Sequence, residues 1–155
     1  MRILLCLLFC CTSLACARPA NTTAVEHTAE SGSHGYMDAT VYSLCAGTLT
    51  ETQKRLPWQT DMEGYALSFV LDDPAVQYEI KKQNGLATAD IASFPAWDNA
   101  ALEAAAVAGV VNTLLAFPDV ESVLLTFDGK PIPALPHGTA TDAAFSAPIR
   151  MDANE

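Results

Sequence analysis

The clearest alternation of hydrophobic and polar residues lies near the middle of the chain. Residues 76–80 alternate in this way, an Asn84-Gly85 pair follows, and residues 86–91 return with strand-forming side chains. Asn-Gly readily adopts the positive φ angles of a tight turn, so the pattern predicts a β-hairpin. The longest helical pattern comes next, with apolar residues spaced by i, i+3, i+4 and i+7: Val107, Val110, Val111 and Leu114. This spacing predicts a helix with one buried face.

The ends of that helix carry their own signals. Asp98 is a good N-cap candidate, and Glu103 lies near the positive end of the helix dipole. Pro118-Asp119 ends the helix, and residues 120–127 alternate as a strand. Because this strand follows so closely, it is expected to supply the sheet face that the helix covers.

The segment before the hairpin predicts two strands and a short helix. Residues 39–44 and 49–58 are rich in strand formers and are interpreted as two strands or a bent ribbon. Asp61 is a plausible N-cap for a helix that ends before Asp73-Pro74. The Asp72-Asp73 pair is interpreted as turn residues that accept backbone N–H groups, because nothing nearby would raise a carboxyl pKa for catalysis.

Composition limits the classes of partner. The chain has 155 residues and a formal net charge of −10, enough for one domain with an acidic, soluble surface. Phosphate binding requires clustered lysine and arginine, whereas the only basic doublets are Lys54-Arg55 and Lys81-Lys82. Nucleic acid is therefore excluded as an expected partner.

Residues 1–16 have the layout of an export signal. Arg2 provides a positive charge, residues 3–11 are apolar, and small residues follow. The apolar run is shorter than the about 20 residues of a membrane-spanning helix. Ser-Leu-Ala-Cys16 resembles a bacterial lipobox, which predicts lipidation of Cys16. Cleavage after Ala17 with simple secretion is the alternative, and an uncleaved anchor is a further one.

Residues 17–37 are predicted to be a disordered tether because they contain few large apolar groups. His27 and His34, with two glutamates nearby (Glu26 and Glu30), could catch a metal weakly, but a flexible segment has no preformed site and no metal is expected. The predicted folded domain spans 38–150, and 151–155 are expected to be a flexible C-terminus.

One thiol and one imidazole form the only conceivable catalytic pair outside the tether. The predicted mature domain keeps a single cysteine, Cys45, and a single histidine, His137. A thiol hydrolase would use both, but the sequence supplies no third group to orient them. Cys45 is therefore interpreted as a small buried residue on a strand, and no catalytic residue is assigned.

Two further groups of side chains have a functional and a structural interpretation. Asn112 and Thr113 look like a polar pair available for function. The structural interpretation is favoured: Thr113 bonds back to a carbonyl one turn earlier, and Asn112 faces solvent or caps a loop. Trp58, Trp97 and Phe94 could line an apolar ligand pocket, but are more often loop anchors packed on a core.

The stretch "NTLLAFPDVESVLLTFDGK", residues 112–130, resembles the most characteristic part of the GerMN domain, a module of sporulation and spore germination proteins and of bacterial envelope lipoproteins. The segments "GTLTETQKRLPW", "NGLATADIAS" and "ALEAAAVAGVV" are similar to its first ribbon, hairpin return strand and helix. The closing segment "GKPIPALPHGTATDAAFSAPI" is also similar, so the resemblance covers Asp38 to Ile149. The chain departs from the pattern between Leu71 and Val76, where family members usually have a longer connection with Gly-Pro.

The resemblance implies an α+β fold: a single compact two-layer sandwich with two helices on one face of a small mixed or antiparallel sheet, like the ring-building motifs of envelope machines. It also implies a noncatalytic, extracytoplasmic module without cofactors. Such a module would bind an envelope protein or its own copies, with sporulation and germination as one setting, and would be held at the membrane by the lipid on Cys16 or be secreted. A small-ligand-binding lipoprotein and a Cys45/His137 hydrolase remain the alternatives.

Overall fold

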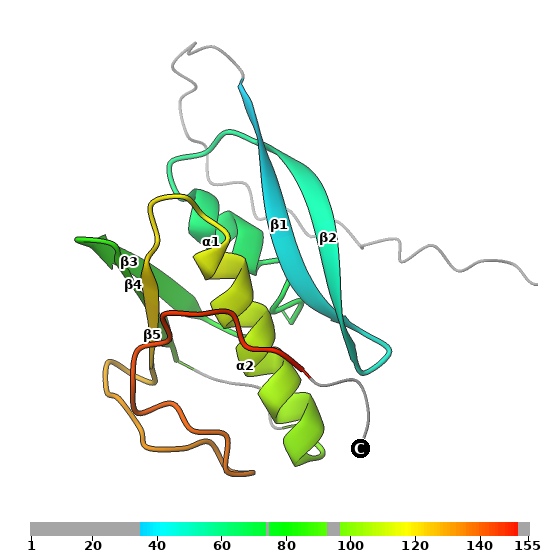
Figure 1. Ribbon diagram of the computed structural model, residues 1–155, viewed down its shortest axis with the longest axis vertical. Coiled ribbons are helices and arrows are strands. Elements are labelled where there is room, and N and C mark those ends of the chain that lie inside the picture. The colour runs from blue at the N-terminus through cyan, green and yellow to red at the C-terminus, as the bar shows by residue number, and fades with distance from the viewer. Residues whose placement is uncertain (1–34, 74, 93–96, 152–155) are drawn as a thin grey trace, which may run out of the picture. The chain divides into compact units, whose positions relative to one another are not determined.

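The computed structural model describes residues 35–73, 75–92 and 97–151. These residues form two helices and five strands, shown in Figure 1. The elements follow one another along the chain in the order β1 (Tyr36–Cys45), β2 (Thr48–Pro57), α1 (Met62–Leu67), β3 (Tyr78–Gln83), β4 (Leu86–Ile91), α2 (Ala100–Leu115) and β5 (Ser122–Thr126).

Strands β1 and β2 form the predicted ribbon. They pair antiparallel from Tyr36 opposite Pro57 to Cys45 opposite Thr48. The intervening Ala46 and Gly47 both have positive φ, at 51° and 81°, as a two-residue hairpin turn of this kind requires. The first strand begins at Tyr36, so the last two residues of the predicted 17–37 tether belong to the folded domain.

The remaining three strands form a second sheet in the order β3-β4-β5. The predicted hairpin is confirmed: β3 and β4 pair antiparallel, and Asn84 and Gly85 turn the chain with φ values of 50° and 78°. Strand β5 pairs with β4 in parallel. A parallel pair needs a crossover connection, and α2 provides it.

Both helices begin at a side-chain cap. The Oδ1 atom of Asp61 accepts a hydrogen bond of 2.8 Å from the Gly64 N–H, which confirms the predicted cap of α1. For α2 the predicted cap is wrong by one residue. Asn99, not Asp98, accepts the Leu102 N–H at 3.0 Å, since the first helical residue is Ala100.

The turn after α1 also agrees with its prediction. Asp73 accepts the Ala75 N–H at 2.9 Å, as expected of a turn residue.

The central part of helix α2 is buried on all sides, whereas its apolar spacing predicted one buried face. Every residue from Ala105 to Leu114 is buried, and Gly109 lies in the middle of that run. The faces without large apolar residues carry small buried side chains, among them Ala105, Ala106 and Ala108. A helix that is hydrophobic all round belongs inside a core. Neither α1 nor α2, the helices of the described chain, has the length and hydrophobicity to cross a membrane.

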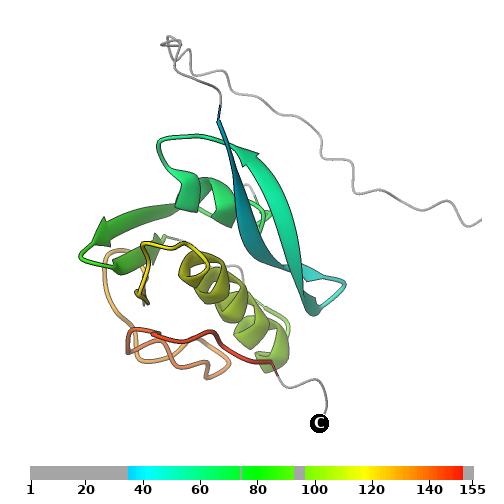
Figure 2. The same ribbon diagram turned by 45° about the horizontal axis from the view of Figure 1, so that its top comes forward.

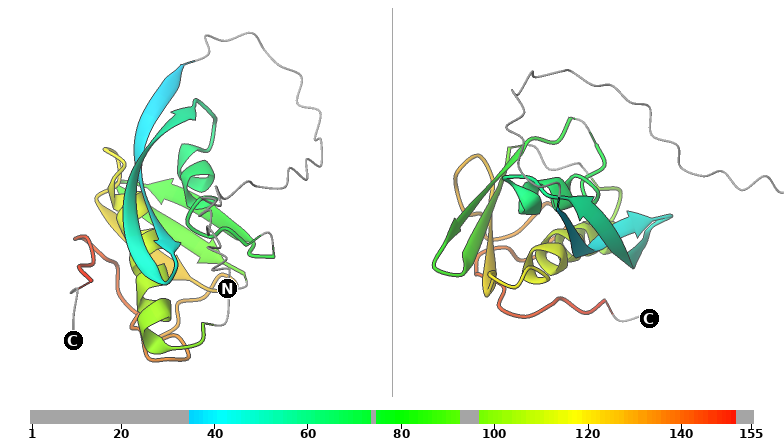
Figure 3. Two further views of the ribbon diagram at one scale, coloured as in Figure 1. Left: turned by 90° about the vertical axis from the view of Figure 1, so that its right-hand side faces the viewer. Right: turned by 90° about the horizontal axis from the view of Figure 1, so that it is seen from above.

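The α+β class and the pair of helices are confirmed, but the strands are divided between two sheets. Both helices lie between the β1-β2 ribbon and the β3-β4-β5 sheet, as the right-hand view of Figure 3 shows. Buried side chains from both sheets and both helices belong to one hydrophobic core. The segment after β5 runs back along α2, which is clearest in Figure 2.

Helix α2 covers part of the outer edge of β1. The Thr113 hydroxyl oxygen accepts a hydrogen bond of 2.9 Å from the Tyr42 N–H. One turn earlier, a Cβ placed on Gly109 would lie only 2.9 Å from the Tyr42 carbonyl oxygen and 3.0 Å from Val70 Cγ1. The predicted bond from Thr113 back along its own helix is therefore replaced by one to the strand. Gly109 permits this close approach because it has no side chain.

We expect Gly109→Ala to lower the free energy of unfolding by about 1–2 kcal/mol, because the clash with β1 exceeds the gain in helix propensity. Urea unfolding followed by circular dichroism measures the change. Ala104→Gly, at a partly exposed position of the same helix, measures the difference in unfolding free energy between alanine and glycine without the clash. A stabilised Gly109→Ala protein would contradict the described contact.

Candidate interaction site

The thiol and the imidazole of the conceivable catalytic pair have different surroundings. Cys45 is exposed at the end of β1, beside the ribbon turn, so the prediction that it is buried was wrong. The ribbon tip extends past the apolar core, whose last β1 member is Val41. His137 Nε2 lies 2.7 Å from the Trp97 carbonyl oxygen. No hydrogen bond joins the Cys45 sulfur to the His137 ring within the described residues.

Glu103 is the most deeply buried acidic side chain of the described chain, with 1% of its surface exposed. Its Oε2 accepts the His137 N–H at 2.9 Å, and its Oε1 accepts the Thr139 N–H at 3.1 Å. The sequence placed Glu103 near the helix N-terminus but gave no sign of these partners, which lie more than 30 residues further along the chain. The carboxylate therefore ties the 137–139 turn to α2.

The environment of Glu103 changes its acidity in two opposing ways. Burial raises the pKa of the carboxyl because it disfavours the charged form. The hydrogen bonds from His137 and Thr139 favour the charged form and hold the pKa below its ordinary value. A carboxylate that accepts two backbone N–H groups is a structural anion rather than a proton donor.

Two more polar side chains attach the segment that follows β5. Asn112 forms a pair of hydrogen bonds with Ile149, donating to its carbonyl at 2.9 Å and accepting from its N–H at 2.7 Å. Asn112 is buried, so the solvent-facing alternative was wrong, while its contact to an irregular segment matches the loop-capping alternative. Asp90 accepts the Gly129 N–H and the Thr126 hydroxyl, both at 2.8 Å. The Gly129 N–H is the main cause of the lowered Asp90 pKa.

Lys82 joins three elements through two carboxylates. Its ammonium group contacts the buried Glu63 of α1 and lies 2.6 Å from Asp119, in the turn before β5. The hydrogen bonds to Asp119 and then to Glu63 raise the pKa of Lys82. The two lysines of the Lys81-Lys82 doublet differ in this respect, since Lys81 pairs at the surface with Glu79 at 3.0 Å.

The open end of the ribbon exposes large aromatic side chains. Tyr36 and Trp58 are 61% and 64% exposed, and the Trp58 N–H donates to the Gly35 carbonyl at 2.9 Å. The Arg55 guanidinium lies 5.2 Å from the centre of the Tyr36 ring. Trp58 is thus not packed on the core as a loop anchor, whereas Trp97 is partly buried. Phe94 lies outside the described residues.

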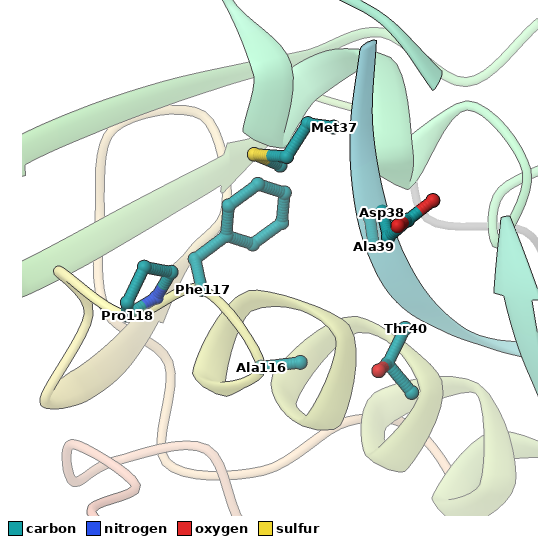
Figure 4. Close-up of a pocket in the computed structure, with 7 residues that line it drawn as sticks. All are labelled: Met37, Asp38, Ala39, Thr40, Ala116, Phe117 and Pro118. Carbon is teal, nitrogen blue, oxygen red and sulfur yellow. The ribbon is translucent and has the colours of Figure 1, made fainter. Parts of the chain in front are cut away.

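A small pocket lies beside this end of the ribbon. It has a volume of about 140 Å³ and lies between β1 and the residues that end α2. Figure 4 shows the Met37 side chain and the Phe117 ring pointing toward one another across it, with the Asp38 carboxylate directed away. The lining comes from two short stretches of chain: residues 37–40 and 116–118.

Several predicted residues lie outside the described residues. They are the candidate lipidation site Cys16 and the weak metal candidates of the tether, His27, His34, Glu26 and Glu30. Residues 35–73, 75–92 and 97–151 contain no group of three or more histidine, cysteine or acidic side chains placed to hold a metal ion.

Comparison with known proteins agrees with this architecture. Residues 62–133 match the family described as "Germane: Sporulation and spore germination". The tandem GerMN domains of the sporulation protein GerM from Bacillus subtilis are similar, with a TM-score of 0.58 and 17% identity over 72% of this chain and 46% of that one. The first GerMN domain of the same protein is also similar, with a TM-score of 0.54 and 18% identity over 67% of this chain and 92% of that one. No curated protein matches the chain.

The described chain has the α+β fold of a GerMN domain. The family match lies within the segment, Asp38 to Ile149, on which the sequence resemblance rested, and it includes the characteristic Asn112–Lys130 stretch. The protein therefore contains a GerMN-like domain, as predicted. It spans less than half of the tandem GerM structure and corresponds in extent to a single GerMN domain.

We expect Glu103→Gln to lower the free energy of unfolding by about 1–3 kcal/mol at neutral pH, because one backbone N–H loses its acceptor. The folded-state pKa of Glu103 is depressed, so its contribution is complete above the unfolded value of about 4.3 and is lost as the pH falls through the folded-state pKa. Thermal unfolding of both proteins across this range measures the difference. A wild-type advantage that persists unchanged at the most acidic pH would contradict the assignment.

Proposed function

We propose that the protein is a noncatalytic interaction module of the cell envelope, whose GerMN-like domain binds another envelope protein. The family description places related domains in sporulation and spore germination, which we propose as one setting for this chain. We expect such a module to act through its surface rather than through reacting groups. The relevant feature is therefore an exposed surface suited to a protein partner.

The observation that carries the proposal is the exposed aromatic end of the ribbon. Tyr36, Trp58 and Arg55 gather there, and tyrosine, tryptophan and arginine are the residues most enriched where protein partners bind tightly. Tyr36 and Trp58, both more than half exposed, are the largest exposed hydrophobic side chains of the described residues. A tryptophan that is 64% exposed contributes little burial to folding, so a partner would supply the missing burial.

The polar groups that sequence analysis considered for function support the same proposal. Glu103, Asn112 and Thr113 all bond to main-chain groups of other segments. These side chains hold the domain together, and their polar atoms are used in those contacts rather than presented to a substrate. Function is then left to the exposed surface.

We also propose that the domain is held outside the cytoplasm by a lipid on Cys16, through the tether of residues 17–37. The motivation is the lipobox-like sequence and the polar composition of the residues after it. Anchoring would confine the GerMN-like domain to a layer near the membrane and raise its effective concentration toward envelope partners.

The binding proposal is tested by photocrosslinking in living cells. A photoreactive residue replaces Trp58 in the full chain, and in a matched control it replaces Lys81, an exposed position on β3. We expect discrete adducts from position 58, because partner atoms would cover it, and none of the same size from position 81.

The same experiment includes Tyr36→Ala in the protein that carries the probe at position 58. Loss of the adduct is expected, since Tyr36 lies at the same end of the ribbon. Adducts that are identical from both probe positions, or absent from position 58, would argue against this surface and against the proposed function.

The anchoring proposal is tested by metabolic labelling with a fatty-acid analogue. Labelled protein is expected in the membrane fraction, and Cys16→Ser is expected to abolish both the label and the membrane association. Cys10→Ser, a change of the same kind within the leader, is expected to retain both. Unlabelled protein released into the medium would instead support simple secretion.

A further inference from the structure

The inference concerns the outer edge of β1, and it rests on the proposed function. Antiparallel strands direct the main-chain groups of alternate residues toward and away from their partner. The Trp58 N–H bonds to the Gly35 carbonyl across the ribbon, and the Tyr42 N–H bonds outward to Thr113. The even-numbered residues of β1 therefore point their N–H and C=O groups away from β2.

Only part of this edge is covered. Thr113 and Gly109 of α2 cover the main chain at Tyr42. Beyond the end of α2, the outward main-chain groups of Asp38 and Thr40 form no hydrogen bond with any other described residue. The uncovered stretch, Tyr36 to Thr40, is here termed the open edge.

The other edges of the described sheets are protected. Phe145 pairs with Val123 through two hydrogen bonds, of 2.9 and 2.7 Å, and so covers the edge of β5 at Val123. The outer strands β2 and β3 carry several charged residues, including the doublets Lys54-Arg55 and Lys81-Lys82. Charged edge residues, lysine above all, discourage the addition of another strand. The open edge carries a single charge, on Asp38.

We propose that the open edge binds an extended segment of a partner protein as an added β-strand, and that this segment alternates apolar with basic residues. Such a strand would satisfy the outward main-chain groups of Asp38 and Thr40, as edge-binding peptides do in other domains. The side-chain preferences follow from the two faces of β1, because neighbouring residues of paired strands share a face.

One face of the added strand is apolar. Residues placed beside Met37 and Ala39 project toward the pocket formed with Phe117 and Pro118. Its volume of about 140 Å³ is close to that of engineered apolar cavities of about 150 Å³ that admit benzene. One branched aliphatic side chain fills such a space.

The other face of the added strand is basic. Asp38 projects there, exposed, and forms no ion pair with another described residue. The Tyr36 ring lies on the same face, and its contact with Arg55, the register partner of Asp38, shows that cation–π geometry is reached there. The net charge of −10 attracts a basic segment and repels a second copy of this chain.

The probe for this inference is a short synthetic peptide of alternating valine and lysine, titrated into the full chain and followed by fluorescence anisotropy. A peptide of the same composition with its valines and lysines in separate blocks controls for charge alone. We expect the alternating peptide to bind more tightly, because only it presents one apolar and one basic face when extended.

Asp38→Pro tests the backbone contact. It removes an outward N–H without touching the hydrogen bonds between β1 and β2, and Pro57 already occupies the equivalent outward position of β2. We expect the peptide affinity to fall by about tenfold or more. Glu51→Pro, which removes one carboxylate and one outward N–H from the far edge of the ribbon, is expected to leave the affinity unchanged.

Methylation of the peptide backbone provides a test that leaves the protein intact. Two peptides are compared, one methylated on the odd-numbered nitrogens and one on the even-numbered nitrogens. One of these two phases is expected to abolish binding and the other to leave it unchanged, because only every second N–H faces β1. Equal effects of both phases, equal binding of the block peptide, or equal affinities of the two proline variants would each overturn strand addition.

The outcomes separate this inference from the proposed function. Failure of the peptide together with a specific adduct from position 58 would overturn strand addition but leave the interaction module in place. A dimer of the full chain that Asp38→Pro dissociates, without peptide binding, would assign the open edge to a second copy and overturn the basic partner. Loss of both peptide binding and adduct would overturn both.

Discussion

The contact between α2 and the main chain of β1 is the constraint on which the rest of the domain depends. Gly109 lets the Tyr42 carbonyl approach the helix, and Thr113, one turn later, receives the Tyr42 N–H. A strand edge placed against a helix would otherwise leave a buried donor without an acceptor, which costs about 1–3 kcal/mol. Because α2 also forms the crossover between β4 and β5, this contact joins the ribbon to the second sheet.

The same helix organises the irregular segment that follows β5. Glu103 near its start binds the 137–139 turn, and Asn112 near its end binds Ile149. An irregular segment that packs on a core must find partners for its backbone groups, and these two side chains supply them. The polar residues that interrupt an otherwise apolar helix are thus anchors for distant parts of the chain.

Sequence reasoning predicted the local features and missed the long-range ones for a common reason. The Asn84-Gly85 hairpin and the Asp61 cap depend on residues a few positions apart, so the sequence contains their signals. The partners of Thr113 and Glu103 lie 71 and more than 30 residues away, respectively, and no local pattern encodes them. The burial of Cys45 was mispredicted because strand propensity says nothing about where a ribbon leaves the core. The sequence contains Tyr36 and Trp58 but no sign that both are exposed at one end of the ribbon, because their exposure depends on how the ribbon packs on the core.

The length of the ribbon relative to α2 explains why an open edge exists at all. Strand β1 continues from Tyr42 to Tyr36, while the helix ends at Leu115 and the chain turns away at Pro118. The core includes Ala39 of the open edge and Leu56 of β2, so this end of the ribbon contributes apolar burial as well as an uncovered edge. The outward main-chain groups of this end and the Tyr36 and Trp58 side chains stay exposed, and an uncovered strand edge of this kind favours aggregation. A partner strand that covers the open edge, and a partner surface that covers Tyr36 and Trp58, would remove both exposures at once, which links the two proposed contacts to one binding event.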